Sequence, residues 1–244
     1  REVKMVLTGD GADELFAGYD KYKYFFSKFD EASNLEGFRS SYADNITLFK
    51  DELKVKLYSS AFFKNLKGEV AHDFFLKPLF EKSKHMDLIN QALYIDVNLL
   101  LPGNNLVKPD RMGMAHGIEN RAPFLDCRVI EQAFRMPGKL KLFEGETKYI
   151  YKKSVSKLIG HDLTYRKKQM FTVPVGDWFK TTLKPLCDDL LLSEKTRARE
   201  LFDYTQVEKM LNDHCSNTEN YTREIRALMA LEIWFRRFDH AVLI

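Results

Sequence analysis

The sequence predicts a mostly α-helical protein with a small α/β remnant at its start. One short apolar run at residues 3–7 leads into a glycine-rich turn, and we find no second convincing strand with turn signals. Elsewhere, apolar residues recur at three- and four-residue spacings, which is typical of helices packed on a core. The 244 residues are 45% hydrophobic and 30% charged, so we expect them to bury a substantial core.

Charge and cysteine content argue against several classes of protein. A net charge of +3 is too small to indicate nucleic-acid binding. The three cysteines, Cys127, Cys187 and Cys215, have no C-x-x-C spacing, which argues against a disulfide framework or a zinc site and favours the cytoplasm. No apolar run approaches the roughly 20 residues that a membrane span needs, so we expect no membrane association.

The first elements form a strand, a turn and a helix. Val3–Leu7 is predicted as a short buried strand, and Glu14 to about Phe26 as the helix after it. The turn between them lies at the carboxyl end of the strand, where open α/β sheets bind their ligands.

The remaining elements are predicted to be helical. Aromatic residues are frequent from Tyr19 to Lys84, and we expect them in the core of several helices rather than in a stacking platform. One face of a long helix carries Met86, Ile89, Leu93, Val97 and Leu100, and Pro102-Gly103 is predicted to end it. Further helices are predicted over Leu106–His116, from a cap at Asp126 after a turn at Pro123 to about Met136, over Thr147–Ile159 before Gly160, and at the end, with Leu228, Leu231, Phe235 and Phe238 on its apolar face.

The turn "VLTGDGADELFAGY" is the first candidate site. It places Asp10, Asp13 and Glu14 among the small residues Gly9, Gly11 and Ala12. Glycines leave backbone N–H groups free to cradle anions, and adjacent carboxylates suit a Mg²⁺ ion that bridges to phosphate oxygens. The structural alternative is that one aspartate caps the next helix. Because a cap needs only one acid, we favour the functional interpretation.

Lys148 is the second candidate. It shares the apolar face of the predicted helix with Tyr151, Val155 and Leu158, and it lies in the first turn, where the helix dipole disfavours a cation. Such a lysine is either the partner of an anion or a lysine with a buried stem and a solvated amine. The spacing alone favours neither interpretation.

Two charged stretches complete the candidates. Arg166, Lys167 and Lys168 form a basic cluster, which is either a solvated charge run or a phosphate or pyrophosphate site. In "LVKPDRMGMAHGIENRAPFLD" we expect a buried or half-buried ion-pair network, with His116 packed and hydrogen-bonded rather than a ligand. The charged members of this stretch are Asp110, Arg111, Glu119, Arg121 and Asp126.

Together, three stretches resemble one family. "TGDGADELFAGY", "LLPGNNLVKPDRMGMAHGIENRAPFLD" and "GETKYIYKK…YRKKQMFTVPVGDW" are similar to the carboxy-terminal part of the synthetase domain of glutamine-hydrolysing asparagine synthetases, from about Val3 to Phe179. The resemblance implies that residues 1–244 are the carboxy-terminal portion of an ATP-pyrophosphatase (adenine-nucleotide α-hydrolase-like) synthetase domain. It also implies ATP and Mg²⁺ as cofactors, and aspartate with ammonia from glutamine as substrates.

The reaction implied by the resemblance forms β-aspartyl-AMP and pyrophosphate, and ammonia then attacks the acyl adenylate. By matching position, Thr8, Gly9 and Gly11 would contact the nucleotide, and Asp13 would hold the metal. Asp10 falls where many relatives carry a glutamate tied to forming the acyl adenylate, and Lys148 matches a lysine that stabilises developing charge. The family's pyrophosphate-binding role would fall to Arg166 and Lys167.

Two parts of the family's pattern do not occur in these 244 residues. They are the "SGGxDS" pyrophosphate loop and the glutaminase half with its amino-terminal nucleophilic cysteine. We therefore expect this chain alone to be inactive in glutamine hydrolysis and inefficient in adenylation. We also expect an exposed sheet edge or apolar face at which the chain associates with the missing segments or as a homodimer. The alternatives are a related amide-forming synthetase with another acid substrate, and a non-catalytic helical scaffold.

Overall fold

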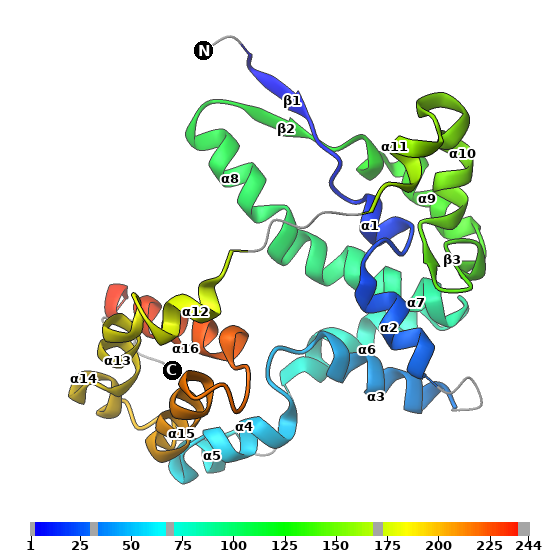
Figure 1. Cartoon of the computed structure of the whole chain (residues 1–244). Coiled ribbons are helices and arrows are strands. Elements are labelled where there is room, and N and C mark those ends of the chain that lie inside the picture. Colours follow the sequence, from blue (N-terminus) through cyan, green and yellow to red (C-terminus); the bar gives the residue numbers. More distant parts are fainter. Residues whose placement is uncertain (1–2, 30–33, 67–70, 168–172, 239–244) are drawn as a thin grey trace. The chain divides into compact units, whose positions relative to one another are not determined.

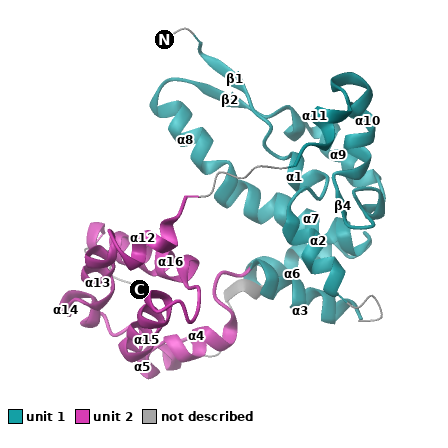
Figure 2. Ribbon diagram, in the orientation of Figure 1, with its two compact units in different colours: residues 1–46, 71–168 teal, residues 47–70, 169–244 magenta. Residues whose placement is uncertain are grey.

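The computed structural model describes residues 3–29, 34–66, 71–167 and 173–238. The chain divides into two compact units, residues 1–46 with 71–168 and residues 47–70 with 169–244 (Figure 2). The described residues are mostly helical, as predicted (Figure 1). Among them, no helix is long and apolar enough to cross a membrane.

Unit 1 carries every strand among the described residues. Its strands are β1 (Met5–Leu7), β2 (Glu119–Arg121), β3 (Leu142–Phe143) and β4 (Glu146–Thr147). Its α-helices are α1 (Ala12–Leu15), α2 (Asp20–Lys28), α3 (Leu35–Ile46), α6 (Ala71–Ser83), α7 (Leu88–Ile95), α8 (Val107–Ala115), α9 (Cys127–Arg135), α10 (Tyr149–Ile159) and α11 (His161–Tyr165). A π-helix, η1 (Asp96–Asn105), and two 3₁₀ turns, η2 (Pro123–Leu125) and η3 (Gly138–Leu140), complete it.

The predicted first strand is present, but it is not buried and it has a partner. β1 pairs in parallel with β2, which places Met5 opposite Glu119 and Leu7 opposite Arg121 (Figure 1). The prediction of no second strand was therefore wrong. The prediction of burial was also wrong, because the side chains of Met5 and Leu7 are 41% and 69% exposed. The expected exposed apolar face thus lies on β1.

The helix predicted from Glu14 to Phe26 is two helices. α1 ends at Leu15 and α2 begins at Asp20. Between them Ala17 has a φ of 54°, a left-handed conformation that interrupts the helical hydrogen bonds. The break turns the chain immediately after the acidic residues.

The core of unit 1 is rich in aromatic side chains, as predicted. Tyr22, Phe38 and Tyr42 are fully buried, and Phe25 packs edge-on against Phe38 and Tyr42 with ring centroids 6.0 and 5.2 Å away. Edge-to-face packing at such distances adds to the free energy gained by burial. These rings, from α2 and α3, support the helix that follows the acidic turn.

The long helix predicted over residues 86–100 changes its winding instead of stopping. α7 carries the apolar face as far as Ile95, and the chain then continues as the π-helix η1 through Pro102 and Gly103. The prediction that Pro102 ends the helix was wrong. In a π-helix the hydrogen bonds skip one more residue, and such wide turns are frequent at functional sites.

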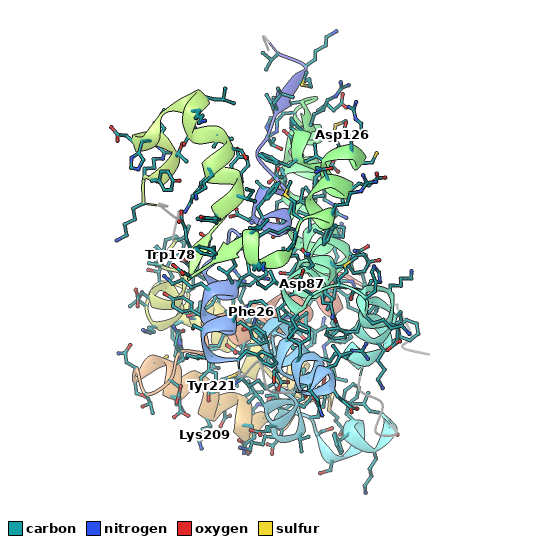
Figure 3. All side chains as sticks on the ribbon, turned by 90° about the vertical axis from the view of Figure 1, so that its right-hand side faces the viewer. Phe26, Asp87, Asp126, Trp178, Lys209 and Tyr221 are labelled. Atoms are coloured by element: carbon teal, nitrogen blue, oxygen red, sulfur yellow. The ribbon has the colours of Figure 1, made fainter. Side chains whose placement is uncertain are left out.

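Other predicted boundaries are confirmed. α8 occupies most of the predicted 106–116 helix, and α10 is followed by Gly160 at its carboxyl end. The side chain of Asp126, labelled in Figure 3, caps α9 by accepting a hydrogen bond from the Arg128 amide at 2.9 Å. These signals were readable because each depends on local backbone chemistry.

The described residues of unit 2 are mostly helical, with one isolated bridge between Tyr58 and Phe202. Its helices are α4 (Asp51–Leu57), α5 (Ser60–Asn65), α12 (Val175–Lys180), α13 (Lys184–Leu192), α14 (Glu194–Arg197), α15 (Tyr204–Cys215) and α16 (Thr222–Arg237). The predicted apolar face of the last helix is only partly correct. Leu228 is buried, but Leu231 and Phe238 are exposed, and the buried face of α16 runs instead through Ile225, Leu228, Met229 and Glu232. The three cysteines are free thiols.

Candidate active site

The acidic turn lies between β1 and α1. The backbone N–H of Thr8 donates to the carbonyl of Arg121 at 2.8 Å, which extends the parallel pairing into the turn. Gly11 precedes α1 with a φ of 90°, a conformation that favours glycine. No side chain caps α1, so the interpretation of an aspartate in this turn as a simple helix cap is wrong.

The structure brings Asp13 and Lys148 together. The Lys148 ammonium lies 3.0 Å from Oδ1 of Asp13, and both side chains are mostly buried, with 23% and 22% of their areas exposed. Partial burial weakens screening by water, so this pair attracts more strongly than an ordinary surface ion pair. Two residues that the sequence suggested separately therefore form one ion pair.

The prediction that Lys148 lies in the first turn of its helix was wrong. It precedes α10 with a φ of 55°, and its backbone N–H donates to the carbonyl of Phe16 at 3.1 Å. The left-handed backbone directs the residue out of the helix and toward the turn that follows α1. A non-glycine residue in this conformation is uncommon and is enriched at functional sites.

The third acid of the turn does not join the first two. Glu14 is 2% exposed and accepts hydrogen bonds at 2.7 Å from the Tyr19 hydroxyl and from Nδ2 of Asn105. Asn105 also donates to the Tyr19 oxygen at 3.0 Å, which closes a triangle of three side chains. Burial, followed by the Glu14 carboxylate, raises the pKa of Tyr19 well above its usual range. Glu14 therefore holds the turn to η1.

The carboxylates of the turn do not form a closed metal cage. In the part of the chain that the structure describes, no group of three or more His, Cys, Asp or Glu residues is arranged to hold a metal ion. Mg²⁺ commonly takes one or two protein carboxylates and completes its shell with water and substrate phosphates. A partly exposed Asp13 beside a glycine-rich turn fits that second pattern, with Asp10 as a neighbouring acid.

The remaining predicted ligand groups are accessible. Thr8 and Asp10 are half-buried, and an added Cβ at Gly9 would meet no atom within 4 Å, so the turn has open space beside it. Arg166 and Lys167 are exposed after α11, and Lys168 lies outside the described residues. The solvated charge run and the anion site both stay predictions for this basic cluster.

The expected buried ion-pair network is wrong. Glu119 pairs with Arg121 at 3.0 Å, and Asp126 pairs at 2.9 Å with Arg128, which lies just after the predicted stretch. Asp110 and Arg111 are exposed. The hydrogen bond from Arg128 lowers the pKa of Asp126 to about 2. His116 is hydrogen-bonded as expected, with Nδ1 3.0 Å from the Met112 carbonyl, but it is exposed rather than packed.

The sequence interpretation missed two groups that support the site, Asn105 with Tyr19 and a buried acid in η1. Asp96 is fully buried, with its carboxylate 2.5 Å from both the Tyr22 hydroxyl and the Lys21 ammonium. A signal existed, because Asp96 is three residues after the buried Leu93 on the predicted apolar face.

The site thus combines a short strand, a glycine-rich acidic turn and a lysine paired with one acid of that turn. The family model described as asparagine synthase matches residues 1–236, and the chain belongs to this family.

Curated relatives agree with this assignment. Asparagine synthetase [glutamine-hydrolyzing] 1 of Bacillus subtilis is 29% identical over 262 residues, which cover 96% of this chain and 40% of the relative. A putative asparagine synthetase of Mycobacterium tuberculosis is 27% identical over 99% of this chain and 41% of its own length. The asparagine synthetase of Gallus gallus is 28% identical over 42% of this chain. The chain thus spans about 40% of the length of the first two relatives. No solved structure matches it.

Proposed function

We propose that this chain is the carboxy-terminal part of the synthetase domain of an ATP-dependent asparagine synthetase with an ATP-pyrophosphatase fold. Family membership over residues 1–236 supports the class of reaction. The single observation that carries the site is the ion pair between Asp13 and Lys148 beside the glycine-rich turn.

In this proposal a side-chain carboxylate oxygen of the substrate aspartate attacks the α-phosphorus of ATP. The bond from that phosphorus to the bridging oxygen breaks, and pyrophosphate leaves. Ammonia, supplied from glutamine, then attacks the acyl carbon of β-aspartyl-AMP and releases AMP and asparagine. Mg²⁺, when bound, would neutralise charge on the phosphate oxygens.

The chain's own residues divide this work by position. Backbone groups of Thr8, Gly9 and Gly11 would approach the nucleotide, and the open space beside Gly9 supports this approach. Asp13 would hold the metal. Asp10, beside it, would be the acid tied to the adenylation step. Lys148 would stabilise negative charge that develops in both steps. Pyrophosphate would meet Arg166 and Lys167 as it leaves.

The test is pyrophosphate release by the complete gene product that carries these residues, with ATP, Mg²⁺ and ammonia, in the presence and absence of aspartate. We expect aspartate-dependent release, and a loss on the order of 100-fold in Lys148→Ala. Lys157→Ala is the matched control, because Lys157 is exposed on α10, the helix that follows Lys148. Release that ignores aspartate, or that survives Lys148→Ala, contradicts the proposal.

The same assay on the 244-residue chain alone separates the site from its context. We expect little release, because these residues contain no "SGGxDS" loop to bind pyrophosphate. Efficient, aspartate-dependent release by the chain alone would show that the loop is not required.

A further inference from the structure

Gly18 lies beside the ion pair, in the turn between α1 and α2. It is buried, and its backbone N–H donates to the carbonyl of Asp13 at 2.8 Å. The neighbouring carbonyl of Phe16 accepts from the Lys148 amide. The short segment 16–18 therefore contacts both members of the pair through its backbone.

The space that a side chain at this position would need is already occupied. A Cβ added to Gly18 would lie 2.1 Å from Oδ1 of Asp13, the oxygen that faces the Lys148 ammonium, and 2.2 Å from Cε of Lys148. It would also lie 2.9 Å from the Asp13 Cα. Contacts below 3.0 Å do not persist, so the two charged side chains would have to move.

Backbone conformation does not explain this glycine. The φ of Gly18 lies outside the left-handed range, unlike that of Gly11. Alanine could therefore adopt the backbone at position 18, and what it could not do is share space with Asp13 and Lys148. The atoms closest to the missing side chain are the interacting ends of the candidate site.

We propose that Gly18 is a positioning residue: its missing side chain is what allows the Asp13 carboxylate and the Lys148 ammonium to meet. This inference deepens the proposed function and rests on it for its catalytic meaning. Its structural content, that Gly18→Ala separates the pair, is independent of the reaction.

The experiment measures the rate at which an amine-acylating reagent labels Lys148, read by mass spectrometry without substrate in the complete gene product. We expect Gly18→Ala to raise this rate several-fold and to leave labelling of the exposed Lys157 unchanged. Gly103→Ala is the matched control, because a Cβ there meets no atom within 4 Å and its φ is not left-handed. Aspartate-dependent pyrophosphate release should fall at least tenfold in Gly18→Ala, mainly in kcat, and stay near wild type in Gly103→Ala.

An Asp13→Ala background decides whether the effect acts through the pair. Lys148 is already unpaired there, so adding Gly18→Ala should change its labelling little. If Gly18→Ala does not fold by itself, it should fold in this background, where the closest oxygen is gone and the flexible Lys148 side chain no longer has Asp13 to hold it beside the new Cβ. Unchanged Lys148 labelling in Gly18→Ala, an equal increase in both backgrounds, or failure to fold in both overturns the proposal. Because labelling needs no substrate, it decides this point even where the pyrophosphate assay fails.

Discussion

The side-chain amide of Asn105 donates a 2.7 Å hydrogen bond to the buried carboxylate of Glu14. This bond joins the last residue of the π-helix η1 to the α1 helix of the acidic turn. The Tyr19 hydroxyl is a second donor to the same carboxylate, and it also accepts a hydrogen bond from Asn105. The wide helix thus supports the segment that carries Asp13.

We expect Glu14→Ala to destabilise the protein by about 1–3 kcal/mol, because the Tyr19 hydroxyl and the Asn105 amide both donate to Oε1 of Glu14 and would lose this acceptor. The denaturant midpoint measures this change. Glu36→Ala is the control, since Glu36 is exposed at the start of α3. Equal midpoints for the two variants would show that the triangle of Glu14, Tyr19 and Asn105 does not stabilise the turn.

Gly11→Ala tests the entry to the turn. We expect a loss of about 2 kcal/mol or more, because the φ of 90° is unfavourable with a side chain and an added Cβ would lie 2.3 Å from Cδ2 of Leu125. In a Leu125→Ala background the steric part disappears and the conformational part remains. The cost of Gly11→Ala, measured as a shift in denaturant midpoint, should therefore be smaller there, and an undiminished cost would rule out the contact as a cause.

Lys141 gives a prediction about pH. It is fully buried, with its ammonium 2.7 Å from Oδ1 of Asn90 and 4.7 Å from the centre of the Phe134 ring. Burial lowers its pKa from 10.5 to about 8. Between these values the unfolded chain binds more protons than the folded protein, so this group makes stability rise with pH, by up to about 3 kcal/mol.

The measurement compares the wild type with Lys141→Met at pH 8 and pH 9.5, using denaturant midpoints. The difference in stability between the wild type and the variant at each pH removes the contributions of other titrating groups, such as the buried tyrosines. We expect the wild type to gain stability relative to the variant as the pH rises. A difference that stays constant, or that moves the other way, would contradict a lowered pKa for Lys141.

The sequence predicted the parts of this structure that depend on local chemistry. The Asp126 cap, the aromatic core and the position of the acidic turn follow from residue type and spacing. β2 was missed because its three residues, Glu119–Arg121, are polar and do not alternate with apolar ones. Its strand pairing depends on β1, which is distant in the sequence.

In the candidate site, too, local features were predicted and contacts between distant residues were not. Asp13 and Lys148 were each suggested by their surroundings, but nothing local to either predicts that they pair. The left-handed backbone at Lys148 was not predictable, because an apolar spacing continues unbroken into α10. Apolar spacing assigns a residue to a helix face only if the residue lies within the helix, and Lys148 lies just before α10.

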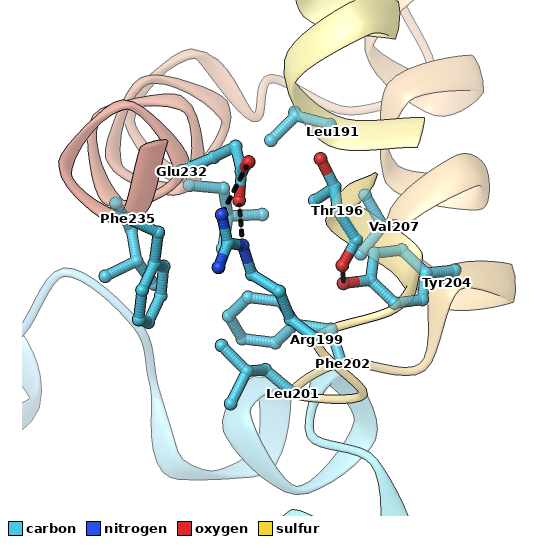
Figure 4. Close-up of a pocket in the computed structure, with 11 residues that line it drawn as sticks. Leu191, Thr196, Arg199, Leu201, Phe202, Tyr204, Val207, Glu232 and Phe235 are labelled. Carbon is cyan, nitrogen blue, oxygen red and sulfur yellow. Dashed lines mark hydrogen bonds and ion pairs between the residues drawn. The ribbon is translucent and has the colours of Figure 1, made fainter. Parts of the chain in front are cut away.

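Unit 2 contains a buried charge whose removal should be costly. Glu232 on α16 is 3% exposed and accepts hydrogen bonds from Nε of Arg199 at 2.8 Å and Nε of Arg236 at 2.9 Å. Figure 4 shows the Arg199 guanidinium facing this carboxylate in a narrow pocket beside Phe235. The carboxylate compensates two cations that burial has partly removed from water.

We expect Glu232→Ala to destabilise the protein by about 3 kcal/mol, because it removes the buried carboxylate that both guanidinium groups contact, while Arg236 keeps its ion pair with Asp189 at 2.7 Å. Glu219→Ala, at an exposed position, should change stability by no more than about 0.5 kcal/mol. Removing Arg199 as well tests the cause: Glu232→Ala should cost less in an Arg199→Met background, where only Arg236 loses its contact with the carboxylate. Denaturant midpoints of the four proteins measure this coupling, and strictly additive costs would mean that Glu232 stabilises α16 by packing rather than by its charge.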